Sequence, residues 1–98
     1  MELKELLKKL ADCNIAVKVK MDHSMIQVRT MMKPNTIMDR PAIRSYYEMA
    51  LDSLVKSNLS YEEWLRQVLL YTVREIKDYC ERNHYRYESE MLKEIIEE

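Results

Sequence analysis

Residues 15–31 read IAVKVKMDHSMIQVRTM, and this stretch decides the class of fold. Apolar and polar side chains alternate from Ile15 to Met21, which is the pattern of a strand with one buried face. The run Asp22-His23-Ser24 is polar and typical of a turn, and a second alternating run extends from Met25 to Met31. The two runs therefore predict an antiparallel β-hairpin.

An isolated hairpin is only marginally stable in water, so this one must pack against helices or pair with a further strand. Residues 2–13 predict one such helix, because four leucines recur at helical spacing: Leu3, Leu6, Leu7 and Leu10. Asn14 tolerates the left-handed conformation in which that helix can end. We expect the strand 25–31 to lie at an open edge, where pairing with a second copy of the chain would close the sheet.

The segment after the hairpin predicts a loop and a second helix. Residues 33–36 form the loop, and Asp39 is a suitable N-cap for a helix with Pro41 in its first turn. We expect this helix to end near Ser57. Its buried stripe is predicted from residues at helical spacing: Ile43, Tyr47, Ala50, Leu51 and Leu54.

The strongest local signal in the chain is the start of a third helix. Ser60 and Glu63 have the spacing of a capping box, and Leu59 with Trp64 has the spacing of a hydrophobic staple. Trp64 is the only tryptophan, and we expect it to be buried. The predicted buried face comprises Trp64, Leu65, Val68, Leu69, Thr72, Ile76, Tyr79 and Cys80.

The C-terminal part predicts a last helical stretch that contains Met91, Leu92, Ile95 and Ile96. We favour a break between Asn83 and Tyr87, and the alternative is one helix from Tyr61 to Glu98. The expected fold class is α+β, in a single small domain of residues 1–98. It consists of an N-terminal helix, a two-stranded antiparallel hairpin, and two or three helices that form most of the core.

The composition excludes several classes of protein. The chain of 98 residues has no glycine, so neither a P-loop nor a dinucleotide-binding fingerprint can occur. The longest apolar run is Val68 to Tyr71, which is far shorter than the roughly 18 residues of a membrane span. Lys4, Lys8 and Lys9 interrupt the first ten residues, so we expect no secretory leader and a cytoplasmic location.

Charge is distributed unevenly along a chain whose net charge is −1. The first 44 residues contain nine basic and five acidic residues, and the remaining residues contain seven basic and twelve acidic ones. One interpretation is that the charged residues simply lie on solvated helix faces, which differ in sign between the two halves of the chain without any functional meaning. The other is a basic N-terminal surface that meets an anionic partner, or the acidic part of a second copy.

The two cysteines and two histidines match the count of a zinc site but not its spacing. Cys80 and His84 share a helix face, whereas Cys13 and His23 do not form a close ligand pair. We therefore predict no metal and no other cofactor. A Cys13–Cys80 disulfide is a second possibility, but reduced thiols are favoured in a chain without a secretory leader.

No pattern of catalytic residues is present. Ser24 follows His23 directly, and adjacent residues of a hairpin point to opposite faces. A G-x-S-x-G motif cannot form without glycine. The sequence therefore predicts a protein that is not an enzyme.

The stretch from Met25 to about Asn83 resembles the ribbon-helix-helix family of DNA-binding dimers. The alternating strand 25–31, a following helix and the capped helix from Ser60 are the matching pieces. In that family, strands from two subunits pair in the major groove, and one strand face reads bases. The resemblance implies Gln27 and Arg29 as base readers. The spacing to the capped helix is longer than in the family, and the usual turn glycine is absent.

In composition, the chain is similar to small uncharacterised proteins of filamentous viruses of thermophilic archaea. The many charged residues, the two glutamines and the abundance of Tyr, Ile, Leu, Glu and Lys are shared features of such thermostable proteins. Eight methionines depart from that pattern. This resemblance implies a viral protein in a host cytoplasm and assigns no functional residue.

The functional hypothesis from the sequence is a non-catalytic binding or regulatory module that acts as a homodimer on an unidentified protein partner. The alternative is a ribbon-helix-helix-like, sequence-specific DNA-binding regulator that reads DNA with the strand 25–31. The candidate nucleic-acid contacts in that alternative are Gln27, Arg29, Lys33, Lys18 and Lys20. No membrane interaction is expected.

Overall fold

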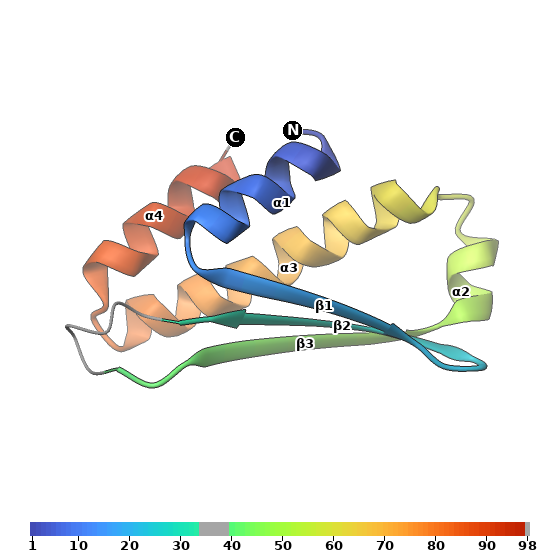
Figure 1. The fold of residues 1–98 in the computed structure, drawn as a ribbon, viewed down its shortest axis with the longest axis horizontal. Coiled ribbons are helices and arrows are strands. Elements are labelled where there is room, and N and C mark those ends of the chain that lie inside the picture. The colour runs from blue at the N-terminus through green and yellow to red at the C-terminus, as the bar shows by residue number, and fades with distance from the viewer. Residues whose placement is uncertain (34–39, 98) are drawn as a thin grey trace.

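The structure, a computed structural model, describes residues 1–33 and 40–97 and has an α+β fold (Figure 1). A three-stranded antiparallel sheet in the order β1-β2-β3 forms one layer, and helices cover one of its faces. The elements in chain order are α1 (Leu3–Asp12), β1 (Ile15–Met21), β2 (Met25–Met32), β3 (Ile43–Ala50), α2 (Leu51–Lys56), α3 (Tyr61–Arg82) and α4 (Arg86–Glu97).

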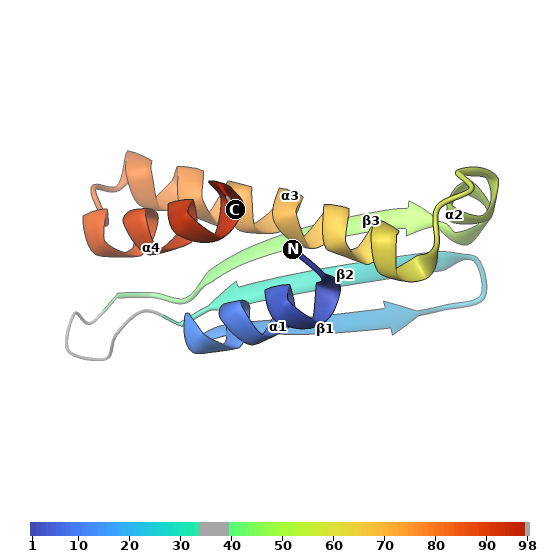
Figure 2. The ribbon, with the colours of Figure 1, turned by 90° about the horizontal axis from the view of Figure 1, so that it is seen from above.

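The helix layer has a simple arrangement when it is seen from above (Figure 2). Helix α1 lies over β1, whereas α3 crosses over β2 and β3. Helix α4 turns back and runs alongside α3, and the short α2 continues from the end of β3 (Figure 1). The helices therefore leave the opposite face of the sheet without a second layer among the described residues.

The predicted hairpin is confirmed. β1 pairs with β2 in an antiparallel register that places Val19 opposite Val28, and the Asp22 N–H donates to the Met25 carbonyl across the turn. Ile26 and Val28 are fully buried, as the alternation predicts for the face toward the helices. The first helix is confirmed as well, and Asn14 has the expected left-handed conformation with φ of 60°.

The prediction of a second helix up to Ser57 is wrong for most of its length. Residues 43–50 form the strand β3, and only Leu51–Lys56 is helical. Ile43 and Tyr47 were part of the helical stripe, but a spacing of four residues also puts two side chains on one face of a strand. Burial alternates with a period of two residues, which is the period of a strand: Ile43 and Ser45 are buried, whereas Arg44 and Tyr46 are exposed. The Asp39 cap lies outside the described residues.

The third strand also corrects the position of the strand 25–31. β2 pairs with β1 on one side and with β3 on the other, so it is the central strand and not an edge. A strand with two neighbours has no free backbone groups for a second copy of the chain. The subunit pairing that the ribbon-helix-helix resemblance implies for residues 25–31 is therefore incompatible with this fold.

The start of α3 agrees with the prediction from the capping box. The Ser60 hydroxyl accepts a hydrogen bond from the Glu63 N–H at 3.2 Å, and Trp64 is only 4% exposed. Seven of the eight residues predicted for the inner face are buried, and Tyr79 is half-buried. Val73 is also buried, although it was not predicted.

The predicted break before the last helix is confirmed, and it forms without glycine. His84 has φ of 60°, and the Tyr85 N–H donates to the Cys80 carbonyl at 2.8 Å while the His84 N–H donates to the Glu81 carbonyl. These two bonds form a Schellman motif with histidine in the left-handed position. The turn reverses the chain, so α4 runs back along α3 and buries Leu92 and Ile95.

A partly buried ion pair holds the segment that leads into β3 against the helix layer. Arg40 Nη1 lies 2.6 Å from each carboxylate oxygen of Glu88 on α4, and the Glu88 side chain is 3% exposed. The guanidinium also lies 4.1 Å from the centre of the Tyr85 ring. This contact joins residues that are 48 positions apart and fixes where the chain enters β3.

Candidate functional site

The uncovered face of the sheet gathers the polar half of every strand. The side chains that alternate with the buried ones come from all three strands, and the strand register sets them in rows that cross the sheet. The rows are Ala16–Met31–Arg44, Lys18–Arg29–Tyr46 and Lys20–Gln27–Glu48. We call these nine residues the open face.

Four cations and one carboxylate stand on the open face: Lys18, Lys20, Arg29, Arg44 and Glu48. All five residues are exposed. Lys18 and Arg29 are directly opposite each other on adjacent strands, where side chains are close neighbours. Like charges in such positions repel each other, and this repulsion is relieved when an anion lies between them.

Helices α3 and α4, in the layer behind the sheet, carry a net negative charge. Helices α3 and α4 together contain nine acidic and six basic residues. Helices α1 and α2 add three acidic and four basic residues, so the four helices together have a net charge of −2, against +3 on the open face. A charge distribution of this kind orients an approaching anion toward the open face.

Tyr46 lies at the centre of a small polar network on β3. Its hydroxyl donates a hydrogen bond to Glu48 Oε2, which also accepts one from Gln27 Nε2 at 3.0 Å. The bond to Glu48 is the main reason that the pKa of Tyr46 is raised above its ordinary value. The Arg29 guanidinium lies 5.7 Å from the centre of the same ring, within reach of a cation–π contact. Tyr46 is therefore held by Glu48 along its own strand and by Arg29 on the neighbouring strand.

A depression of about 450 Å³ opens on this face between the first two rows. Ala16 and Met31 contribute apolar surface, while Lys18, Arg29 and Arg44 contribute cationic groups around it. Tyr46 also lines the depression and is 47% exposed. The combination of apolar and aromatic surface with cationic groups suits a ligand that is flat, apolar on its faces and anionic at its edge.

The structure brings together four of the five residues that the sequence suggested as nucleic-acid contacts. Lys18, Lys20, Gln27 and Arg29 share the open face, and Lys33 is exposed just after the end of β2. Arg44 and Tyr46 were missed because residues 43–50 were assigned to a helix. The local signal for them is only partial: Ile43, Tyr47 and Met49 alternate with Arg44, Tyr46 and Glu48, but the polar Ser45 interrupts the apolar set.

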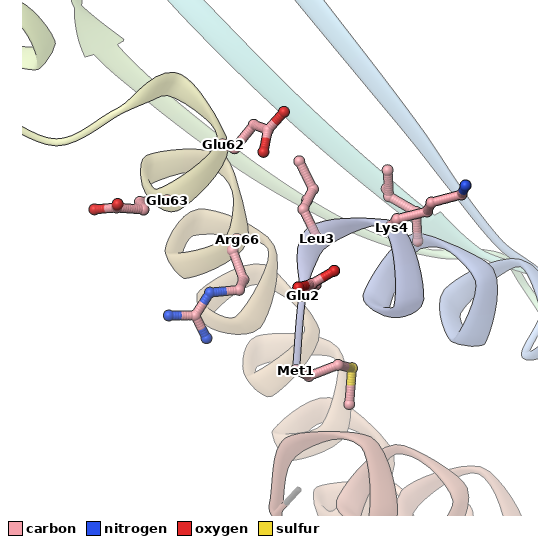
Figure 3. Close-up of a pocket in the computed structure, with 8 residues that line it drawn as sticks. Met1, Glu2, Leu3, Lys4, Glu62, Glu63 and Arg66 are labelled. Carbon is pink, nitrogen blue, oxygen red and sulfur yellow. The ribbon is translucent and has the colours of Figure 1, made fainter.

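A second and larger depression, of about 770 Å³, lies between the N-terminal ends of α1 and α3 (Figure 3). Its charged lining is mixed, with Glu2, Glu62 and Glu63 near Lys4 and Arg66. Figure 3 shows that these side chains point in different directions and do not converge on one point. This depression therefore offers no centre of one charge sign, in contrast to the open face.

The two cysteines are buried, and their environment lowers the reactivity of their thiols. Cys13 and Cys80 are free thiols in the structure. Burial, followed by the neighbouring Glu88 carboxylate, raises the pKa of Cys80 to about 11, and burial likewise raises the pKa of Cys13. A thiol that stays protonated at neutral pH is a poor nucleophile and a poor metal ligand. Within residues 1–33 and 40–97, no three His, Cys, Asp or Glu side chains cluster in a way that could hold a metal ion.

Comparisons with protein-family profiles, with curated proteins and with solved structures found no match for this chain. Among the described helices, none is both long and apolar enough to cross a membrane.

Proposed function

We propose that this protein is a non-catalytic binding module that holds single-stranded nucleic acid across the open face of its sheet. The observation that carries the proposal is the grouping of three cations and an exposed tyrosine around one depression on the uncovered face of the sheet, with Lys20 on the same face.

The phosphate and the base of a nucleotide each have matching groups on this face. Lys18 and Arg29 can contact phosphate oxygens, because both are exposed cations in one row. Tyr46 and Met31 offer the aromatic and apolar surface on which a base can stack. Sheet surfaces that bind single strands combine a cationic path for the backbone with aromatic side chains that stack on bases.

The shape of the face favours single strands over duplex DNA. The major groove accepts a helix or a two-stranded ribbon. Here the polar residues stand on a three-stranded sheet backed by a layer of helices, and the residues suggested as base readers, Gln27 and Arg29, are on its central strand. A flexible strand can spread its bases over such a surface, whereas the stacked bases of a duplex are reached only through a groove.

The proposal is tested by fluorescence polarisation with labelled oligonucleotides of about 12 nucleotides, a length within the usual range for such surfaces. Single-stranded DNA, single-stranded RNA and a mixed-sequence duplex are each titrated at about 50 mM and about 200 mM salt. With about three phosphate contacts, single-strand binding should weaken roughly 20-fold between the two salt concentrations.

Two matched variants locate the binding surface. Arg29→Ala removes a cation from the open face, and Lys93→Ala removes an exposed cation from α4. We expect Arg29→Ala to weaken binding and flatten the salt dependence, while Lys93→Ala leaves both unchanged. The proposal is wrong if single strands fail to bind at the lower salt concentration or if the two variants behave alike. Preference for the duplex would instead support the DNA-binding regulator that the sequence suggested.

A further inference from the structure

The sheet has two edges, and they differ in how they could meet a second copy of the chain. β1 and β3 are the outer strands, with seven and eight residues. Within the described residues, each has hydrogen-bonded strand pairing only to β2. An edge strand presents unpaired backbone groups that can pair with another strand. Side-chain charge decides which of these edges can pair with itself.

The β1 edge opposes self-pairing in the register that would pair all seven of its residues. A two-fold antiparallel pairing centred on Lys18 places that lysine against its own copy. Pairing centred on Val19 instead places Lys18 against the partner's Lys20, twice. Like charges directly opposite each other destabilise a strand pair, and lysines on edge strands are a common protection against such pairing.

The β3 edge has the complementary arrangement. Antiparallel pairing centred on Tyr46 places Arg44 opposite the partner's Glu48, and the symmetry repeats this contact on the other side. Arg44 has no ion-pair partner among the described residues, and both hydrogen bonds that Glu48 accepts go to Oε2. The register therefore joins an unpaired cation to a carboxylate oxygen that is still able to accept a hydrogen bond.

Aromatic side chains flank both sides of this edge. Tyr46 stands on the open face and is 47% exposed, while Tyr71 of α3 is 48% exposed on the helix side. The centres of the Tyr71 and Tyr47 rings are 5.7 Å apart, and the rings pack edge to face. Tyr47 occupies a position of β3 that faces the helices. Tyrosine and arginine are enriched in the cores of protein interfaces relative to other surface.

We propose that the outer edge of β3 is the interface between two copies of this chain, with Tyr46 opposite the partner's Tyr46. The two sheets then form one antiparallel sheet of six strands with a continuous open face. The contact is the same on both copies, so the assembly closes as a dimer and does not grow into a fibre. The proposal does not depend on nucleic-acid binding, and it assigns an interface to the homodimer expected from the sequence.

The proposal is tested by sedimentation velocity without nucleic acid, over a range from low to high micromolar protein. The unmodified chain should be a dimer at the upper end of this range. Arg44→Glu and Glu48→Arg should each be monomeric, because each places like charges opposite each other at both symmetric contacts. Lys18→Glu, a charge reversal on the other edge, should dimerise as the unmodified chain does.

Mixing the two monomeric variants tests the register directly. When an Arg44→Glu chain meets a Glu48→Arg chain, both cross-strand contacts join opposite charges, so the mixture should sediment as a heterodimer. Circular dichroism melting verifies that each variant is folded. If Arg44→Glu does not fold, Arg44→Gln removes the attraction without reversing the charge and should weaken the dimer at least severalfold. The proposal is overturned if the unmodified chain is monomeric throughout, if a folded variant at Arg44 still dimerises fully, or if the mixture stays monomeric.

Discussion

The two faces of the sheet come from the same three strands, yet they have opposite properties. On the covered face, Ile26, Val28 and Met32 are almost fully buried against the helices. On the open face, the alternating neighbours Lys18, Arg29 and Arg44 are exposed. Since a strand directs successive side chains to opposite sides, one residue step separates the core from the proposed ligand surface. Changes on the covered face should therefore alter stability, and changes on the open face should alter binding.

The largest effect is expected from Trp64→Ala, on the helix layer that covers the sheet. Trp64 is 4% exposed and its ring lies 6.4 Å from that of Tyr47 on β3. Removal of the indole leaves a cavity and should lower the free energy of unfolding by about 3–5 kcal/mol. Urea unfolding followed by circular dichroism measures the change. Arg29→Ala serves as the open-face control, with an expected change within about 0.5 kcal/mol. Equal stability of the two variants would remove the contrast between the faces.

A smaller effect of opposite sign is expected from Thr30→Val on the covered face. Thr30 is 1% exposed, and its hydroxyl has no hydrogen-bond partner among the residues that the structure describes. Replacement of an unsatisfied buried hydroxyl by a methyl group of similar shape should raise the free energy of unfolding by about 1 kcal/mol. The same urea experiment measures it. A loss of stability would mean that the hydroxyl is hydrogen-bonded in solution.

The smallest effect is expected from Glu48→Gln on the open face. This change removes the one carboxylate among the nine residues and should strengthen oligonucleotide binding about two- to threefold, the size expected for one exposed charge near the ligand. The pKa of Tyr46 should also fall toward its ordinary value, because the hydrogen bond to the carboxylate is its main cause of elevation. Polarisation measures the first effect and ultraviolet titration of tyrosine the second. Both chains are compared at concentrations where they have the same state of association. Weaker binding would contradict the role of charge on this face.

The sequence predicted the local features well, and the reason is that they depend on neighbouring residues. The hairpin, the Ser60 cap, the burial of Trp64 and the break after Arg82 each arise from a short stretch with its own signal. The grouping of Lys18, Lys20, Gln27 and Arg29 followed from the same alternation that predicted the hairpin.

The sequence could not place β3, and with it three of the nine residues of the open face. Ile43, Tyr47 and Leu51 are spaced by four, which satisfies a helix and a strand alike over a short run. Whether this segment becomes a helix or a strand depends on its pairing with β2. In that pairing Arg44 lies opposite Met31, which is 13 positions earlier in the sequence. Such pairing leaves no mark in a local pattern. Arg44 and Tyr46 were therefore absent from the predicted site, although they complete the depression on the open face.

Methyl NMR of methionine tests most directly the central claim that nucleic acid lies on the open face. Met31 lines the depression on that face, whereas the next residue, Met32, is 1% exposed on the covered side. With the methyl groups labelled by carbon-13 and the two signals assigned through Met31→Leu and Met32→Leu, a single-stranded oligonucleotide is added in steps. A base stacked in the depression should shift the Met31 signal by its ring current and leave the Met32 signal nearly unchanged. An unchanged Met31 signal under conditions where polarisation shows saturation would contradict the account.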